Sequence, residues 1–112
     1  MATPVVGASW EGFVIENLIN AAPYRTAASY YRTAAGAEID LMLEFASGEK
    51  WAIEIKRSRA PKREKCFHRA REDIKPDKSF VVYAGEERYP AGQGVDVIGL
   101  HEITKLVAEP SA

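Results

Sequence analysis

The sequence predicts an α/β (α+β) domain in which a mixed central sheet is flanked by helices. Two stretches that alternate apolar and polar residues, 38–45 and 50–57, lie between two stretches with helical periodicity, 9–22 and 62–75. Two short apolar runs and a last helical stretch follow. This order favours helices packed on a mixed sheet. With 112 residues and no long linker, one domain spanning 1–112 is expected.

The first two predicted elements are a helix and a short strand. In the helix at 9–22, Trp10, Val14, Leu18 and Ala21 recur on one stripe. Ser9 suits the N-cap position, and Pro23 ends the helix because it cannot continue the backbone hydrogen bonds. Residues 29–33 are aromatic and β-branched, which predicts a strand.

The next two predicted strands form an antiparallel hairpin, because a very short turn at 46–49 joins them. Their odd-numbered side chains are apolar and must meet the core together: Ile39, Leu41, Leu43, Phe45, Trp51, Ile53 and Ile55. The even-numbered side chains then share the opposite face. A three-residue turn places Asp40 opposite Glu54, and a turn two residues longer places it opposite Lys56.

The second half of the chain supplies the remaining elements. Pro61 marks the start of the helix at 62–75, whose apolar stripe holds Phe67, Ala70 and Ile74. Residues 78–85 and 94–100 are predicted strands, and residues 101–107 predict a short helix. The order of elements is therefore α-β-β-β-α-β-β-α.

Composition limits the classes of protein to consider. Hydrophobic residues make up 46% and charged residues 28%, which is typical of a globular domain. Cys66 is the single cysteine, so no internal disulfide forms and a reducing compartment fits. No apolar run approaches the ~20 residues that span a bilayer. A cytoplasmic protein without a membrane segment is expected, whereas its oligomeric state is not specified.

Carboxylates on one face of the hairpin are the first functional signal. Asp40 and Glu54 repel one another unless a cation lies between them, and Lys56 or a divalent metal such as Mg²⁺ would serve. Glu11 falls within the apolar arc of the first helix, where an acid is costly unless it is paired. The alternative is a surface hairpin with an ordinary ion pair.

A basic stretch at 56–71 is the second signal. It holds eight of the fifteen Lys and Arg residues and a single acid, Glu64. Such a block is either a phosphate-binding patch or a solvated helix face.

The segments "GASWEGFVIENL", "YYRTAAGAEIDLMLE", "WAIEIKRS" and "FVVYAG" together resemble a known family. They are similar to the C-terminal domain of a group of bacterial and archaeal AAA+-type ATPases of unknown function, a domain counted within the PD-(D/E)xK nuclease-like superfamily. The resemblance covers about residues 7–107 and implies an α-β-β-β-α-β core of the restriction-endonuclease-like type. It implies a catalytic set of Glu11, Asp40, Glu54 and Lys56. Ile39 stands where some members have proline.

The resemblance also implies a cofactor and partners. Mg²⁺ or Mn²⁺ would be held by Asp40, Glu54 and the carbonyl of Ile55, with Glu11 acting directly or through water. Lys56 would orient the attacking water. DNA backbone contacts would come from the basic side chains Arg32, Arg57, Arg59, Lys62, Arg63 and Arg69.

The sequence contains no P-loop signature. The ATPase domain that the resemblance implies would therefore be a partner of this domain, in cis or in trans. Two functions remain open at this point. One is a metal-dependent nuclease, and the other is a catalytically silent module of an uncharacterised ATPase that binds nucleic acid or protein.

Overall fold

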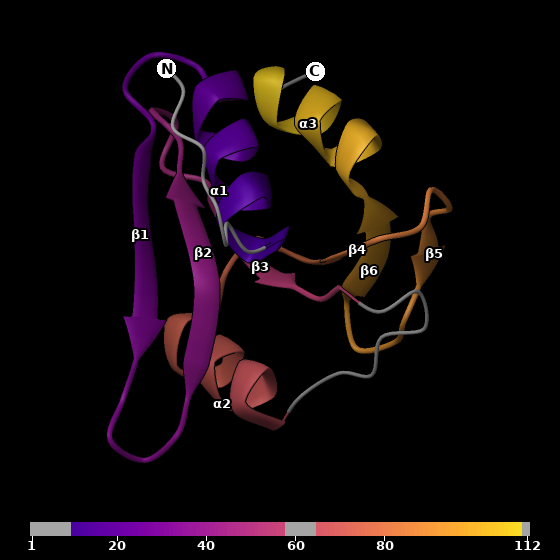
Figure 1. Ribbon diagram of the computed structural model, residues 1–112. Coiled ribbons are helices and arrows are strands. Elements are labelled where there is room, and N and C mark those ends of the chain that lie inside the picture. The colour runs from indigo at the N-terminus through magenta and orange to yellow at the C-terminus, as the bar shows by residue number, and fades with distance from the viewer. Residues whose placement is uncertain (1–9, 58–64, 111–112) are drawn as a thin grey trace.

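A computed structural model of the chain describes residues 10–57 and 65–110. Within these ranges the elements follow the order α1 (Trp10–Ala21), β1 (Ala27–Arg32), β2 (Glu38–Glu44), β3 (Lys50–Ile55), α2 (Lys65–Ile74), β4 (Lys78–Tyr83), β5 (Tyr89–Pro90), β6 (Val95–Gly99) and α3 (Leu100–Ala108) (Figure 1). The predicted order is confirmed, with the addition of the two-residue strand β5. Ser9 and Pro61, the predicted helix starts, lie outside the described residues.

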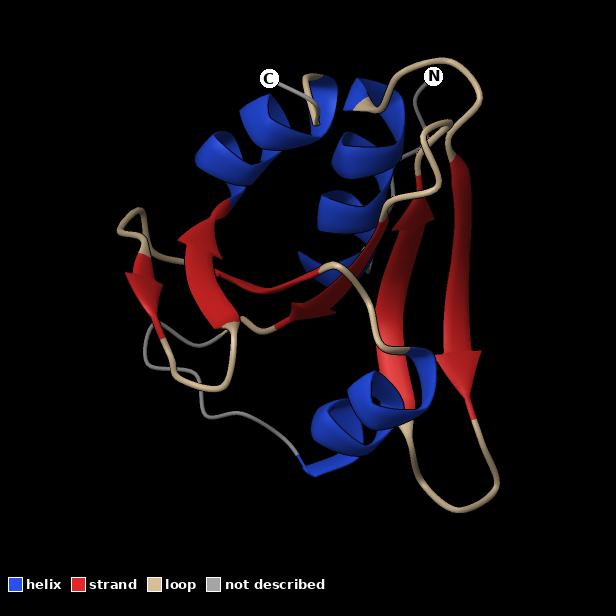
Figure 2. Ribbon diagram, turned by 180° about the vertical axis from the view of Figure 1, so that it is seen from behind, coloured by secondary structure: helices blue, strands red, loops and turns tan. Residues whose placement is uncertain are grey.

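The sheet has six strands in the order β1-β2-β3-β4-β6-β5. β1, β2 and β3 are antiparallel neighbours, β3, β4 and β6 run parallel, and β5 pairs antiparallel with β6. The predicted mixed sheet with flanking helices is therefore confirmed. Figures 1 and 2 show α1 and α3 on one side of this sheet and α2 on the other.

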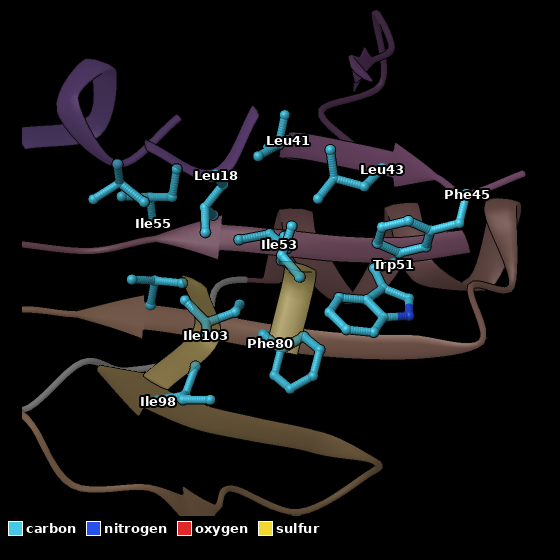
Figure 3. Packing of buried hydrophobic residues seen from close by; sticks show 13 residues of the cluster. Leu18, Leu41, Leu43, Phe45, Trp51, Ile53, Ile55, Phe80, Ile98 and Ile103 are labelled. Atoms are coloured by element: carbon cyan, nitrogen blue, oxygen red, sulfur yellow. The ribbon is translucent and has the colours of Figure 1, made fainter. Parts of the chain in front are cut away.

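The larger core lies between the sheet and the pair α1 and α3. Val14 and Leu18 of α1 and Ile103 and Val107 of α3 are fully buried there. Figure 3 shows apolar side chains of β2, β3, β4 and β6 meeting these helices, with Trp51 next to Phe45 and Phe80. The odd-numbered side chains of β3 contribute Trp51, Ile53 and Ile55, as the alternation predicts.

A smaller core lies under α2, on the other face of the sheet. Phe67 and Ala70 of α2 pack against Ala52 of β3 and Val81 of β4. β3 is consequently buried on both faces from Trp51 to Ile55. The even-numbered face of β3, which a surface hairpin would expose to water, is instead covered, and Glu54 lies on it.

A β-bulge changes one expectation for β2. Between the pairs Ser29–Met42 and Tyr31–Ile39, β1 advances two residues while β2 advances three. The extra residue reverses the direction of the side chains that precede it. Ile39 was expected beside Leu41 in the core under α1, but it is fully buried in the cluster under α2. Strict alternation carries no sign of such an inserted residue.

No helix within 10–57 and 65–110 combines the length and the apolar character needed to cross a bilayer.

Candidate active site

A pocket of about 260 Å³ opens beside the carboxyl end of β3. Side chains or backbone from α1, β2, β3 and α2 line it: Glu11, Glu38, Asp40, Glu54, Ile55, Lys56 and Cys66. The four residues expected to be catalytic thus meet in one place. Asp40, Glu54 and Lys56 come from the β2–β3 hairpin, whereas Glu11 comes from α1, which the tertiary structure brings to the end of the hairpin.

The register of the β2–β3 hairpin places Asp40 at this pocket. The pairs Leu41–Ile53 and Glu44–Lys50 are those that the three-residue turn predicts. Beyond Leu41, the Asp40 carboxylate accepts a hydrogen bond from the backbone N–H of Ile55 at 2.9 Å. Asp40 is therefore held by its own side chain against the end of the neighbouring strand.

Glu54 is the most perturbed acid in the pocket. Only 5% of its surface is exposed. Burial, the charge of Asp40 and a hydrogen bond with Asp40 together raise its pKa from 4.5 to about 8, and burial is the largest of these causes. The Lys56 ammonium, whose Nζ lies 3.4 Å from Oε2 of Glu54, opposes this effect. Lys56 does not offset burial and repulsion, so the neutral form of Glu54 is favoured when no other cation is bound.

Glu11 lies at the rim of the pocket and not in the core. Its side chain is exposed in the first turn of α1, which corrects the expectation of a core-facing acid. Partial burial raises its pKa, and the negative charges of Asp40 and Glu38 add to the effect. The helical wheel predicted that the Glu11 side chain faces the core under the sheet. In the structure the first turn of α1 lies beside the carboxyl end of β3, where the pocket opens. Glu11 thus points at the pocket.

Two further residues line the pocket without having been assigned a role there. Glu38 precedes Asp40 by two residues in β2, and its carboxylate lies 3.7 Å from Arg32. The Glu-x-Asp spacing was the sequence signal for Glu38. Cys66, which is exposed, comes from the start of α2. Only the packing of α2 under the sheet places it here, so no local pattern could have identified it.

The residues predicted to contact DNA differ in their position and in their contacts within the domain. Arg57 directly follows Lys56 and is exposed. Arg32 lies beside Glu38 and places its guanidinium 5.5 Å from the ring centre of Tyr30. Arg69 donates a hydrogen bond at 3.4 Å to the carbonyl of Ala35 in the β1–β2 turn. The remaining predicted contacts lie outside the described residues: Arg59, Lys62 and Arg63.

The basic character of α2 is partly structural. Arg71 donates hydrogen bonds to the Ser79 hydroxyl and the Gln93 carbonyl, both at 2.8 Å. These bonds tie α2 to β4 and to the loop before β6. Arg71 therefore connects elements of the fold, whereas Lys65 and Arg69 leave the helix on its exposed side.

The donor set suits a metal that retains water. Within 10–57 and 65–110, no three or more His, Cys, Asp or Glu side chains are grouped to hold a metal ion. Asp40 and Glu54 instead form a pair of carboxylates that hydrogen-bond to one another. Mg²⁺ is commonly bound by one or two carboxylates and keeps several water ligands. The pair therefore fits Mg²⁺ or Mn²⁺ and does not fit a closed structural Zn²⁺ site.

Comparison with known proteins places the chain in a family. It is 37% identical over 100 residues to an uncharacterized protein of Mycobacterium bovis and, equally, to an uncharacterized protein of Mycobacterium tuberculosis. These alignments cover 89% of this chain and 22% of each relative, so the chain spans about a fifth of their length. No solved structure matches it. The model of the family described as "Domain of unknown function (DUF4143)" matches residues 6–103, and the chain belongs to this family.

Proposed function

We propose that this domain is a metal-dependent, nuclease-like phosphodiesterase of the PD-(D/E)xK type that acts on DNA. The observation that carries the proposal is the carboxylate pair of half-buried Asp40 and buried Glu54, with Lys56 in the same pocket. The order of α1, β1, β2, β3, α2 and β4 supports the assignment, since it is the order that the resemblance implies. We further propose that the domain works with a P-loop ATPase domain in cis or in trans.

The carboxylate pair supports a cation-binding role through its electrostatics. Burial and the charge of Asp40 raise the pKa of Glu54 to about 8, which favours its neutral form when no cation is bound. A divalent cation between the two carboxylates would replace that proton, since metal ligands bind in the deprotonated form. Occupation of the pair is therefore expected to strengthen as pH rises from 6 towards 9. When bound, the metal would supply a water of lowered pKa and neutralise charge on a phosphate oxygen.

The chain's own groups would complete the chemistry. The Ile55 N–H orients the Asp40 carboxylate, and the Ile55 carbonyl is available at the same strand end. Glu11 faces the pair from the rim and would contact a bound ion through water. The Lys56 ammonium lies beside Glu54, where it would orient the attacking water and stabilise the charge that develops on the phosphate.

The negative charge of the pocket determines whether the metal or the DNA phosphate binds first. Four acids and one lysine line the pocket: Glu11, Glu38, Asp40, Glu54 and Lys56. Such a pocket repels a phosphate until a cation occupies it. Exposed Arg57, next to the pocket, would hold the DNA backbone through a contact that salt weakens. Metal is therefore expected to bind before DNA is cut.

A second candidate function rests on the lysine beside the two carboxyl groups. Lys56, 3.4 Å from Glu54, places a positive charge in the pocket without a metal. A domain in which this contact persists would be a catalytically silent module of an ATPase, one that binds nucleic acid or protein. It would bind DNA with a strong salt dependence and release no cleaved product.

Incubation of the whole chain with supercoiled plasmid tests the two functions against each other. With Mg²⁺ or Mn²⁺, we expect nicked and linear products from the parent protein and none with EDTA. Asp40→Asn and Glu54→Gln should abolish cleavage, whereas Glu16→Gln, the same change at an exposed site on α1, should not. Cleavage that survives both Asp40→Asn and EDTA would refute the proposed site. DNA binding without cleavage under any metal would favour the silent module.

A further inference from the structure

Trp10 links the first helix to the end of β3. Its indole Nε1 donates a hydrogen bond to the backbone carbonyl of Lys56 at 3.1 Å, across 46 residues of sequence. The rest of the side chain is partly buried and packs against the larger core. Tryptophan suits such a position because it combines a large apolar body with one N–H donor at its edge.

Lys56 depends on its surroundings for its backbone position. It follows the last residue of β3, and Arg57 after it is exposed. The Lys56 N–H donates to the Val82 carbonyl of β4 at 2.8 Å. β4 thus anchors one side of this residue and Trp10 anchors the other. These two hydrogen bonds hold the Lys56 backbone on both sides. They thereby fix the direction in which its side chain extends towards Glu54.

The same side chain sets where α1 begins. Trp10 is the first residue of α1, and Glu11 is the next. A hydrogen bond from Trp10 to the end of β3 therefore places the first helical turn beside the pocket that Glu11 lines. The Trp10 indole N–H thus links the backbone of Lys56, at the end of β3, to the first turn of α1, which carries Glu11.

We propose that Trp10 is a positioning residue of this site, whose indole N–H holds the Lys56 backbone and the first turn of α1 in a fixed relation. This inference rests on the proposed function, because it assigns Trp10 a role in the chemistry of Lys56 and Glu11. A displacement of about 1 Å in a catalytic group costs up to about a hundredfold in rate. The bond is therefore expected to affect turnover more than substrate affinity.

Trp51 provides a matched control. It is the other tryptophan of the chain, it is buried, and its Nε1 has no hydrogen-bond partner in the described structure. In a Trp51→Phe background, Trp10 is the single indole. Replacing tryptophan by 3-benzothienylalanine during expression then exchanges only the Trp10 N–H for sulfur and keeps the ring body. Trp10→Phe is a second variant that removes the donor by ordinary mutagenesis.

Nicking kinetics with Mn²⁺ give the first measurement. In the Trp51→Phe background, the benzothienyl protein should show kcat reduced by roughly tenfold to a hundredfold, with KM changed by less than about twofold. Trp51→Phe itself should keep kcat within about twofold of the parent. Parental kcat in the benzothienyl protein would overturn the inference.

Backbone ¹⁵N relaxation gives a measurement that does not need activity. Lys56 should have an order parameter near ~0.85 in the Trp51→Phe protein and below ~0.7 in the benzothienyl protein. Strand residue Ile53, at the centre of β3, should not change. Should the parent protein cut nothing, the proposed function fails, and this comparison alone decides whether Trp10 positions Lys56. An unchanged order parameter at Lys56 would overturn the inference in either case.

Discussion

The protonation of Glu54 has a measurable consequence for stability. Its pKa is about 8 in the folded protein against an ordinary value of 4.5, so the folded state keeps a proton that the unfolded chain releases. The contribution of Glu54 to stability is therefore complete below pH 4.5 and is lost as pH rises to about 8. Each pH unit within this window costs about 1.4 kcal/mol, which amounts to roughly 3–4 kcal/mol between pH 5 and pH 8.

The variant Glu54→Gln tests this prediction, because glutamine resembles the neutral acid and does not ionise. We expect it to match the parent near pH 5 and to exceed it by roughly 3–4 kcal/mol at pH 8. Urea unfolding followed by tryptophan fluorescence, in EDTA and at several pH values, measures the difference. Glu16→Gln, at an exposed position of α1, controls for the loss of one negative charge and should stay within about 0.5 kcal/mol of the parent.

A second variant separates the causes of the raised pKa. Burial is the largest cause and Asp40 the next, so Asp40→Asn should lower the pKa of Glu54 without returning it to 4.5. The pH window over which stability is lost should become narrower and shift to lower pH. A difference between Glu54→Gln and the parent that does not vary with pH would refute the reasoning, since it would mean that Glu54 ionises equally in both states.

Three further predictions concern the metal, the lysine and the packing. At pH 8, Mn²⁺ at about a hundred times its dissociation constant should stabilise the parent by about 2.7 kcal/mol in urea unfolding and should leave Glu54→Gln unchanged. Lys56→Met should retain Mn²⁺ binding by calorimetry yet lose cleavage of plasmid; loss of both would make the lysine a structural residue. Leu18→Ala, in the core under α1, should cost roughly 2–5 kcal/mol, whereas Ile19→Ala, 43% exposed, should cost less than about 0.5 kcal/mol by the same assay.

The sequence determined most elements because hydrophobic periodicity reflects local geometry. Alternation in 38–45 and 50–57 predicted the hairpin, and the short turn limited the register to two alternatives. Side-chain parity by itself places Asp40, Glu54 and Lys56 near one another. The sequence did not predict β5, because a strand of two residues is too short to show an alternation of apolar and polar side chains.

The tertiary structure decided how that set of residues is surrounded. α2 packs on the face of the sheet that carries Ala52 of β3, and Glu54, two residues along the same strand, is a buried acid. Helix periodicity predicted that α2 has an apolar stripe but not which face of the sheet the stripe covers. The pKa of Glu54 depends on that choice, because desolvation is its largest cause.

The bulge in β2 and the placement of Glu11 also separate what the local sequence pattern determines from what the packing of elements determines. The alternation of 38–45 gave Ile39 the wrong face, since an inserted residue leaves no trace in a pattern of period two. The helical wheel placed Glu11 on the core side of α1, but only the position of α1 over the end of β3 makes that side an open pocket. The sequence alone determined which residues share a strand face or a helix face, because those are properties of local backbone geometry. Which faces meet, and hence which acids are desolvated together, was decided by long-range packing.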